Sequence, residues 1–263
     1  MTAHPGARLR SVRVWRDGEL REVEVASARE VPVTLRLNGR EIITLLASDD
    51  ALEYLAAGFL KGEGFVSRRE EITAIRVDPE RGTVDVDAVG VDPLAERLLE
   101  RRAVTSGCGK GTTFTHALDA IQAQPAPAGP HVSVAAVRAL VQRLLASSAL
   151  YREAGGVHSA ALATAAEIVI FRDDIGRHNA VDKIHGECFL RGIPVEDKVL
   201  LTTGRVSSEI LVKAAKLGVA ILVSRSSATD LALELAERTG ITVIGQVRGG
   251  GLTVYAGAGR VSG

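Results

Sequence analysis

One cysteine of this chain lies in a loop that is rich in glycine and carries a lysine. Residues 105–113 read Thr-Ser-Gly-Cys-Gly-Lys-Gly-Thr-Thr, so that Cys108 lies between two glycines and Lys110 follows it closely. Three glycines in five positions disfavour a helix or strand, because glycine loses the most backbone entropy on ordering. The Lys110 ammonium and free backbone N–H groups would favour the thiolate, the reactive form of a thiol. The loop therefore predicts a reactive Cys108, and the alternative is a small buried residue in a turn.

Four polar segments interrupt the apolar pattern of the second half of the chain, at the ends of expected strands. In an open α/β sheet, loops at the carboxyl ends of strands line the ligand crevice. Glycine followed by arginine or serine at a helix start offers N–H groups, a positive helix end and a guanidinium to an anion. We therefore expect a site for a phosphorylated ligand, with Arg205, Arg225 and Arg248 as phosphate contacts. The four segments are residues 155–159, 172–183, 203–209 and 224–229.

Each polar segment also has a structural interpretation. In residues 172–183, eight of the twelve residues are charged, imidazole or amide, which is dense for a surface turn. A hydrolase that uses Asp174 and His178 as acid and base is a further alternative. The structural alternatives are a helix cap at Asp174, a core histidine at His158 or His178, a capping signal at Ser207, and a solvated helix face at Asp182 and Lys183.

Metal and dithiol chemistry fit the spacing less well. His178 and Asp182 are four residues apart and would share a helix face with Asp173 and Asp174 nearby. Arg177 and Lys183 add competing positive charge, so we predict no metal site. Gly111 occupies the position that a Cys-x-x-Cys motif would need for its second thiol. The Pro-Cys-x-x-Cys signature of zinc deaminases is also missing.

Composition narrows the class of protein. The 263 residues are 46% hydrophobic and 3% aromatic, and 32 Lys and Arg balance 32 Asp and Glu. This balance argues against a nucleic-acid binder. Two distant cysteines cannot form a disulfide framework. The beginning of the sequence has no apolar run, and no apolar stretch reaches membrane-spanning length. We therefore expect a cytoplasmic protein with neither nucleic acid nor membrane as a partner.

The first half of the chain predicts a β-rich α+β domain. Short alternating runs fill residues 11–46, and Asn38-Gly39 predicts a hairpin between residues 33–37 and 41–46. We expect Ser48, Asp49 and Asp50 to cap a helix that runs to about Lys61 and ends at Gly62 and Gly64. The remaining expected elements are strands at 75–77 and 83–89 and helices at 94–102 and 115–123.

A proline-rich stretch at residues 124–130 is the clearest linker, and the pattern beyond it alternates helices and strands. We therefore expect two domains, residues 1–124 with the Cys108 loop near the end and residues 131–263 with an α/β fold. The expected strands are 158–164, 167–172, 198–202, 220–224 and 242–246, and the expected helices are 134–147, 179–190, 207–216 and 229–239.

The ordered motifs closely resemble one known family, the FdhD family of formate dehydrogenase accessory sulfur carriers. The resemblance covers nearly the whole chain, and the stretch from Asp173 to Lys183 is its most specific part. The motifs are Gly58-Phe-Leu, Gly62-Glu-Gly, the Cys108 loop, Gly155-Gly-Val-His-Ser, Asp173-Asp-Ile-Gly-Arg-His-Asn-Ala-Val-Asp-Lys, Thr203-Gly-Arg-Val-Ser-Ser-Glu, Ser224-Arg-Ser and Gly245-Gln-Val-Arg-Gly-Gly.

The resemblance implies sulfur transfer. Similar proteins accept sulfur from a cysteine desulfurase as a cysteine persulfide. They pass it to bis-molybdopterin guanine dinucleotide, which holds molybdenum or tungsten, before this cofactor enters formate dehydrogenase. The resemblance also implies a cytidine-deaminase-like C-terminal domain without zinc, and a homodimer. The alternative is a chaperone that delivers the dinucleotide without sulfur chemistry.

The site residues that the resemblance implies are carried over one by one. The persulfide falls on Cys108, with Lys110 to stabilise its thiolate, and Gly111 replaces a second cysteine found in many members. Gln246 and Gly251 stand where the family more often has phenylalanine and arginine. The expected cofactor contacts are Gln246, Val247, Arg248, Gly249, Gly250 and Gly251, together with Arg205, Arg225, Ser226, Asp174 and His178.

Overall fold

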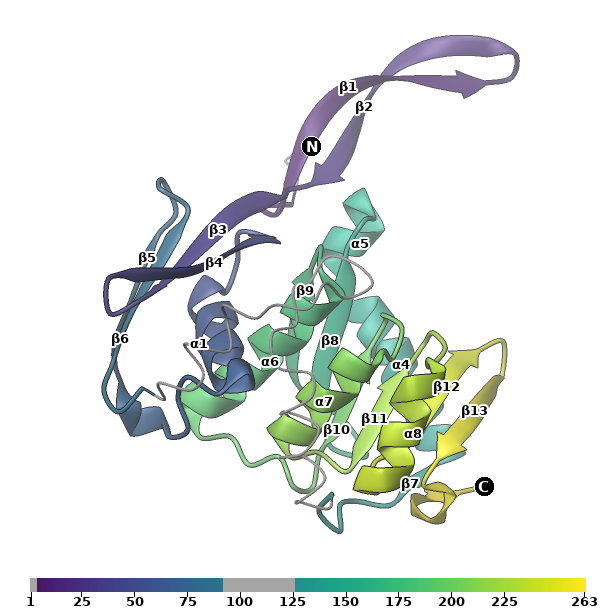
Figure 1. Cartoon of the computed structure of the whole chain (residues 1–263). Helices are drawn as coiled ribbons and strands as arrows, with labels where there is room; N and C mark the ends of the chain where they lie inside the picture. The colour runs from purple at the N-terminus through teal and green to yellow at the C-terminus, as the bar shows by residue number, and fades with distance from the viewer. Residues whose placement is uncertain (1–3, 92–125) are drawn as a thin grey trace.

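A six-stranded mixed sheet forms the centre of the second half of the chain (Figure 1). The computed structural model describes residues 4–91 and 126–263. The strand order is β13-β12-β11-β10-β8-β9; β10, β11 and β12 are parallel, β8 is antiparallel to β10 and to β9, and β13 is antiparallel to β12. The strands are β8 (His158–Ala163), β9 (Ile168–Asp174), β10 (Val199–Thr202), β11 (Ile221–Ser224), β12 (Thr242–Arg248) and β13 (Gly251–Ala256).

Helices cover both faces of this sheet, which confirms the predicted α/β fold. Side chains alternate between the faces, because successive residues of a strand point to opposite sides. Leu200 packs in the core with α6, α7 and α8, whereas Leu201 packs in the core with α4. The cytidine-deaminase-like arrangement stays a prediction. The helices are α4 (Val134–Ser147), α5 (Ala149–Ala154), α6 (Arg177–Arg191), α7 (Ser208–Leu217) and α8 (Asp230–Thr239).

The first half contains a four-stranded sheet that packs against helix α1 (Leu52–Glu63). The predicted hairpin is confirmed, and Asn38 and Gly39 have φ of 51° and 79°, as its type I′ turn requires. The predicted end of the helix is also confirmed, with Gly64 as the C-cap at φ 84°. The strands are β3 (Val31–Leu37), β4 (Arg40–Ala47), β5 (Ile72–Asp78) and β6 (Thr83–Ala88).

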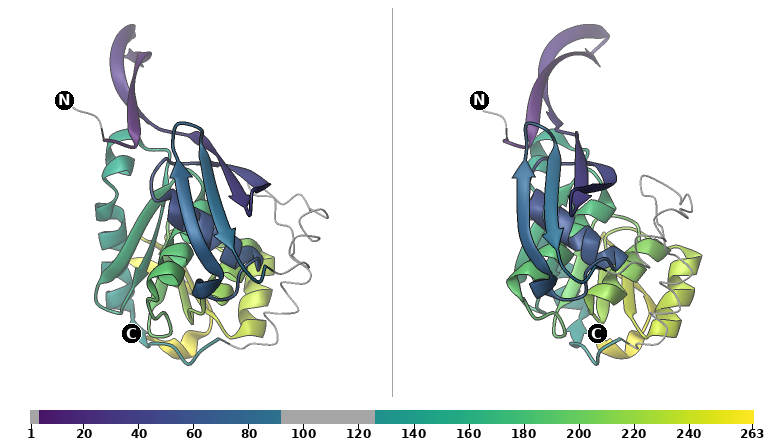
Figure 2. Two further views of the ribbon diagram at one scale, coloured as in Figure 1. Left: turned by 90° about the vertical axis from the view of Figure 1, so that its left-hand side faces the viewer. Right: turned by 60° about the vertical axis from the view of Figure 1, so that its left-hand side comes forward.

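A long two-stranded hairpin, β1 (Ala7–Arg16) and β2 (Glu19–Ala28), precedes this sheet and extends away from the rest of the described chain (Figures 1 and 2). We call it the arm. At the other end of the chain, β14 (Val261–Ser262) pairs in parallel with β7 (Val132–Ser133), just before α4.

The two halves are joined where α1 crosses α6, and glycines allow the crossing. A Cβ atom on Gly58 would lie 1.9 Å from the carbonyl oxygen of Asp182. A Cβ atom on Gly186 would lie 1.9 Å from the carbonyl oxygen of Tyr54. The backbones of the two helices are therefore in direct contact, which only glycine permits at these positions. Figure 2 shows α1 between the four-stranded sheet and α6.

The predicted N-terminal cap of α1 is wrong. Its N-cap is Ala51, with φ of 50° and no side-chain cap hydrogen bond. The hydroxyl of Ser48 accepts a hydrogen bond from Ile175 N, Asp50 accepts from Lys183, and Asp49 pairs with Arg29. These partners outside the helix compete for the polar side chains that would otherwise cap it.

The predicted helices at 94–102 and 115–123 lie outside the described residues, and residues 126–130 are neither helix nor strand. The proposed domain boundary therefore stays a prediction. Among the helices of residues 4–91 and 126–263, none is long and apolar enough to span a membrane.

Candidate functional site

The four polar segments meet at one edge of the six-stranded sheet, as the sequence predicted. The parallel strands β10, β11 and β12 end at this edge. Strand β8 begins there and β9 ends there, because Thr202 pairs with Ala160 and His158 pairs with Asp174. Helices α6, α7 and α8 start close to the same edge. In α/β sheets this edge is the usual place for a ligand.

Hydrogen bonds hold the loops of this edge together. The hydroxyl of Ser224 donates to the carbonyl of Gly204 at 2.6 Å. The N–H of Arg225 donates to the carbonyl of Thr202 at 3.1 Å, and that of Gln246 donates to the carbonyl of Ser226 at 2.8 Å. Residues 202–204, 224–226 and 246 are therefore joined by hydrogen bonds into one continuous surface, which we call the support.

Three exposed arginines stand on this support. Arg205 follows β10, Arg225 follows β11 and Arg248 ends β12, so they come from adjacent strands. A guanidinium presents planar donors that can bind phosphate through two parallel hydrogen bonds. The arrangement suits a ligand with more than one phosphate.

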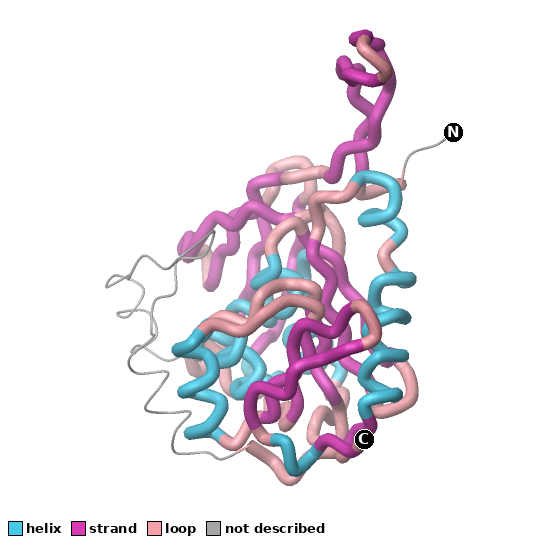
Figure 3. The backbone as a smooth tube through the Cα atoms, turned by 90° about the vertical axis from the view of Figure 1, so that its right-hand side faces the viewer, coloured by secondary structure: helices cyan, strands magenta, loops and turns pink. Residues whose placement is uncertain are grey.

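The stretch from Gln246 to Gly251 divides into exposed and buried parts. Gln246 has φ of 53°, uncommon for a residue other than glycine, and lies in an irregularity of the β12–β13 pairing. Val247 is buried and packs in the core with α4, so its side chain does not face solvent. Gly249 and Gly250 form the two-residue turn of the β12–β13 hairpin, with φ of 59° and 88°. Gln246, Arg248 and the glycines are thus accessible. Figure 3 shows the C-terminus at the end of the described chain opposite the arm.

His158 and Arg177 also lie at this edge, although the sequence pattern did not predict them as ligand contacts. His158 Nδ1 is 3.4 Å from the Thr203 hydroxyl. Burial, and then electrostatic interactions with Arg177 and His178, lower the pKa of His158, which favours its neutral imidazole. Arg177 lies against Gly204, where a Cβ atom would be 2.8 Å from that of Arg177. In the sequence, only Gly204, the residue before Arg205, indicates that another side chain packs closely at this position.

Asp174 is not placed to contact a ligand, which corrects the prediction. Its side chain is fully buried. One carboxylate oxygen accepts hydrogen bonds from Gly176 N and Asn179 Nδ2 at 2.8 and 2.9 Å. The other accepts from Ser48 N at 3.1 Å and pairs with Lys183 at 2.8 Å. Asp174 therefore joins the two halves internally, and a hydrolase with Asp174 as its acid does not fit.

Asp182 and Lys183 are also buried, so the interpretation as a solvated helix face is wrong. Lys183 bridges Asp174 and Asp50. Lys213 donates to Asp182 at 2.5 Å, yet burial still raises the pKa of Asp182.

The remaining polar groups of the long motif bond to further protein groups. His178 Nε2 lies 3.0 Å from a carboxylate oxygen of Glu209 in the first turn of α7. Ser207 is the N-cap of α7, which confirms the capping interpretation. Asp173 accepts hydrogen bonds from the hydroxyls of Ser148 and Ser159. Thus Asp173, Asp174, His178 and Asp182, considered above as metal ligands, each bond to different partners.

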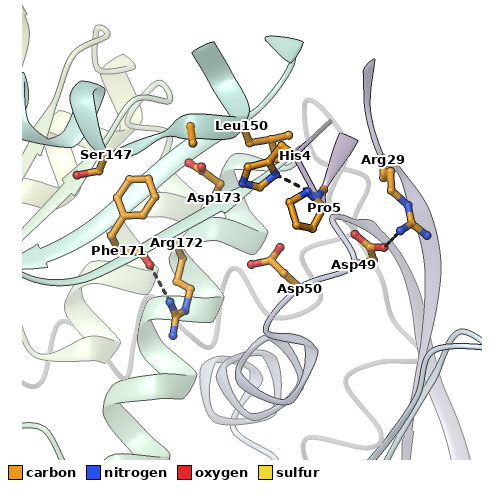
Figure 4. A pocket seen from close by; sticks show the side chains of 12 residues that line it. His4, Pro5, Arg29, Asp49, Asp50, Ser147, Leu150, Phe171, Arg172 and Asp173 are labelled. Carbon is orange, nitrogen blue, oxygen red and sulfur yellow. Dashed lines mark hydrogen bonds and ion pairs between the residues drawn. The ribbon is translucent and has the colours of Figure 1, made fainter. Parts of the chain in front are cut away.

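A cavity of about 390 Å³ lies beside this motif, at the base of the arm (Figure 4). Asp173 lies beside His4 on one side of it, and the pair of Arg29 and Asp49 lies on the other. Burial raises the pKa of Asp173. With Asp50 the cavity has three carboxylates beside the guanidinium groups of Arg29 and Arg172. The arginine-bearing edge therefore fits a phosphorylated ligand better.

The structure describes one of the two cysteines. Cys108 and Lys110 lie outside the described residues. Cys188 packs in the core, where burial raises the pKa of its thiol to about 12. Its thiolate is scarce at neutral pH, and the prediction that Cys188 fills the core is confirmed.

Comparisons with known proteins point to one family. Residues 28–262 match the family described as the FdhD/NarQ family. The chain is 40% identical over 250 residues to the "Sulfur carrier protein FdhD" of Bacillus subtilis, covering 94% of this chain and 95% of the relative. It is 38% identical over 249 residues to the protein of the same name from Staphylococcus aureus strain MRSA252, covering 94% and 93%.

A solved structure with a similar fold supports the same family. A crystal structure described as a formate dehydrogenase accessory protein from Desulfotalea psychrophila superposes with a TM-score of 0.80 at 28% identity, covering 98% of this chain and 100% of that chain.

Proposed function

Because the chain belongs to the FdhD/NarQ family, we propose that it is a sulfur carrier for the maturation of formate dehydrogenase. Cys108 accepts sulfur from a cysteine desulfurase and delivers it to bis-molybdopterin guanine dinucleotide, with molybdenum or tungsten as the metal. The observation that carries the binding half of this proposal is the set of three exposed arginines at the ends of adjacent strands.

Loading is an exchange between thiolate and persulfide. The Cys108 thiolate attacks the terminal sulfur of a cysteine persulfide on the desulfurase. A new S–S bond forms at Cys108, the S–S bond of the donor breaks, and the donor cysteine leaves as a thiolate. A glycine-rich loop suits this exchange because the same sulfur must reach two partners. Gly111 leaves no thiol at that position to attack the loaded persulfide.

Binding of the dinucleotide uses the arginine edge. Arg205, Arg225 and Arg248 hold the phosphates, and Gln246 and Ser226 offer an amide and a hydroxyl beside them. The turn at Gly249 and Gly250 has no side chains to obstruct a ligand. Support for this assignment comes from exposure, from the shared edge and from the hydrogen bonds that fix the loops.

Delivery returns Cys108 to the thiolate. The S–S bond of the persulfide breaks and the terminal sulfur becomes a sulfide ligand of the cargo metal. The two electrons that convert this sulfur to sulfide come from oxidation of the metal by two units.

A loading assay tests the sulfur chemistry. The protein is incubated with a cysteine desulfurase and cysteine, and its mass is measured for the gain of one sulfur atom. We expect loading of the wild type and of a Cys188→Ala control, and none of Cys108→Ala. Loading of Cys108→Ala would refute the assignment. Activation of formate dehydrogenase by Cys108→Ala at the wild-type level would favour the chaperone alternative.

A nucleotide titration tests the binding edge separately. Calorimetry with GDP compares the wild type with an Arg225→Ala/Arg248→Ala double variant. We expect affinity to fall roughly 100-fold, because each charged hydrogen bond contributes about 1.5–3 kcal/mol. Arg238→Ala, on the exposed last turn of α8, is the matched control and should bind as the wild type does. Equal affinity of the double variant and the wild type would reject the edge as the binding site.

A further inference from the structure

The cavity at the base of the arm has no part in the proposed sulfur chemistry. Its volume is about 390 Å³, enough for a small organic molecule (Figure 4). Its walls come from three places in the chain, namely the residues that flank the arm, the loop before α1, and strand β9 with the junction of α4 and α5. The side chain of Asp50 in this wall is 58% exposed, so the cavity is open to solvent there. A small ligand therefore has access to it.

One carboxylate in this cavity lacks a cation. Asp173 is half-buried, and its two oxygens accept hydrogen bonds from the hydroxyls of Ser148 and Ser159 at 2.7 and 2.6 Å. Within residues 4–91 and 126–263, no lysine, arginine or histidine forms an ion pair with it. A carboxylate has about four lone-pair sites, so the two serine bonds leave room for a further donor. Burial raises the pKa of Asp173, as expected of a carboxylate whose charge is poorly compensated.

The two arginines of the cavity are already paired with other carboxylates. Arg29 lies 2.7 Å from Asp49, and Arg172 lies 2.5 Å from Glu187 on α6. Figure 4 shows the guanidinium of Arg172 directed away from Asp173. Neither arginine therefore neutralises this carboxylate.

The ammonium of Lys183 is likewise in use. It lies 2.9 Å from Asp50 and 2.8 Å from Asp174. It also donates to Asp173 at 3.1 Å, but to the backbone carbonyl and not to the carboxylate. An ammonium has three donors, so this one has none left for a third carboxylate. The cavity thus favours a further positive charge, because a half-buried carboxylate is costly without a partner.

We propose that this cavity binds a primary alkylammonium, which donates to Asp173 and Asp50 while its alkyl chain packs against Leu150 and Phe171. An ammonium fits two carboxylates from different elements because its three donors point in different directions, whereas those of a guanidinium lie in one plane. Among the described residues, no group of three His, Cys, Asp or Glu suits a metal ion. The ammonium belongs to a free amine or to a lysine side chain of a partner protein. This site is separate from the proposed sulfur chemistry.

Calorimetry with butylamine, which has the ammonium and alkyl chain of lysine, tests the site directly. The full chain is titrated at pH 8, where the amine is protonated and the ionised form of Asp173 is favoured. We expect saturable binding with a dissociation constant of roughly 1 mM, as for a ligand of few atoms. Tetramethylammonium has the same charge and no N–H donor, so it should bind at least roughly 10-fold more weakly. No saturable binding of butylamine up to about 50 mM, or equal affinity of the two cations, overturns the proposal.

Two variants locate the bound amine. Asp173→Asn keeps the size of the side chain and removes its charge, so the affinity for butylamine should fall at least roughly 10-fold. Asp50→Asn leaves both serine bonds of Asp173 in place and should weaken binding roughly 5-fold, and it decides the test if Asp173→Asn does not fold. Asp230→Asn, at the exposed start of α8, is the matched control and should bind as the wild type does. Circular dichroism checks the fold of each variant. Wild-type affinity of a folded cavity variant overturns the assignment.

Two further titrations separate the sources of the ammonium. Spermidine represents free polyamines, and N-acetyl-lysine methylamide represents a lysine within a protein. Tighter binding of the capped lysine supports a partner protein as the source, and tighter binding of spermidine supports a free amine. If neither binds as tightly as butylamine, the cavity does not accept a biological amine and the proposal is overturned. Loading of Cys108 is scored separately, so its failure and that of the amine site are distinguishable.

Discussion

The polar motif of residues 172–183 and the turns after β10 and β11 all carry charged side chains, yet these side chains have opposite placements. Asp174, Asp182 and Lys183 are buried at the junction of the two halves, where each charge has a partner of opposite sign. Arg205 and Arg225 are exposed. The more distinctive motif therefore joins the halves, and the shorter ones present groups to a ligand. A dense polar motif does not by itself mark a binding surface.

The close crossing of α1 and α6 explains this difference. Because the helix backbones touch at Gly58 and Gly186, water is excluded beside them. A charge in such a place is costly unless it is paired and hydrogen-bonded. The arginines at the exposed edge of the six-stranded sheet are hydrated, so they need no partner of opposite charge.

The largest expected effect comes from breaking the buried pair. Lys183→Met leaves the Asp174 carboxylate buried without its cation, so we expect a loss of about 3–5 kcal/mol of unfolding free energy. Urea unfolding measures it. The Asp174→Asn/Lys183→Met variant should lose less than the sum of the two single changes, because the residues act as a pair. An additive result would show that the pair does not act as a unit.

A methyl group in the helix crossing should cost somewhat less. Gly58→Ala places a Cβ atom against the backbone of α6, and overpacking of this kind costs about 1–3 kcal/mol. Gly62→Ala is the matched control in the same helix, because its nearest neighbours lie at 3.9 Å. It should be neutral or stabilising by up to about 1 kcal/mol. Equal effects of the two changes on the urea midpoint would contradict the close crossing.

The junction should also make stability depend on pH. Burial first, and then Lys213, Lys61 and Lys216, lower the pKa of His185 to about 3. The unfolded chain therefore binds a proton near pH 6.5 that the folded chain does not, and stability falls as the pH drops below that value. Between pH 7.5 and 5, we expect His185→Gln to lose about 2 kcal/mol less than the wild type. Parallel pH dependence of the two proteins, followed by urea unfolding, would exclude this role.

The smallest expected effect belongs to the open edge. Arg205→Ala and Arg225→Ala should each change the unfolding free energy by no more than about 0.5 kcal/mol, as surface substitutions usually do. The same variants should bind GDP more weakly. A large loss of stability on thermal unfolding would show that these arginines support the fold rather than a ligand.

The sequence predicted local elements better than their long-range contacts. The helix from Val134 to Ser147 was predicted with its observed bounds, because its apolar period is a local signal. The Asn38-Gly39 turn was predicted for the same reason. Ser48 was wrongly predicted to cap the helix, because the residue that donates to its hydroxyl, Ile175, lies 127 residues away. The burial of Asp174 was missed because it depends on the approach of α1 to α6.

At the candidate site, the sequence identified the arginines and their common edge through the strand pattern. It did not separate Val247, which faces the core, from its exposed neighbours. The irregular pairing of β12 with β13 decides which side chains of this stretch point outward. No periodic pattern of residues encodes that irregularity.

The short pairing of β7 with β14 closes the α/β half on itself. Arg260 adds to it by donating to the carbonyls of Pro127, Ala128 and Gly240. Residues 127–133 and residues 260–262 are thus held side by side. A short peptide that joins these two segments should yield a circular α/β half with little change in its sheet and helices. Removal of the residues after Gly257 should instead release residues 127–133 from the contacts with β14 and Arg260.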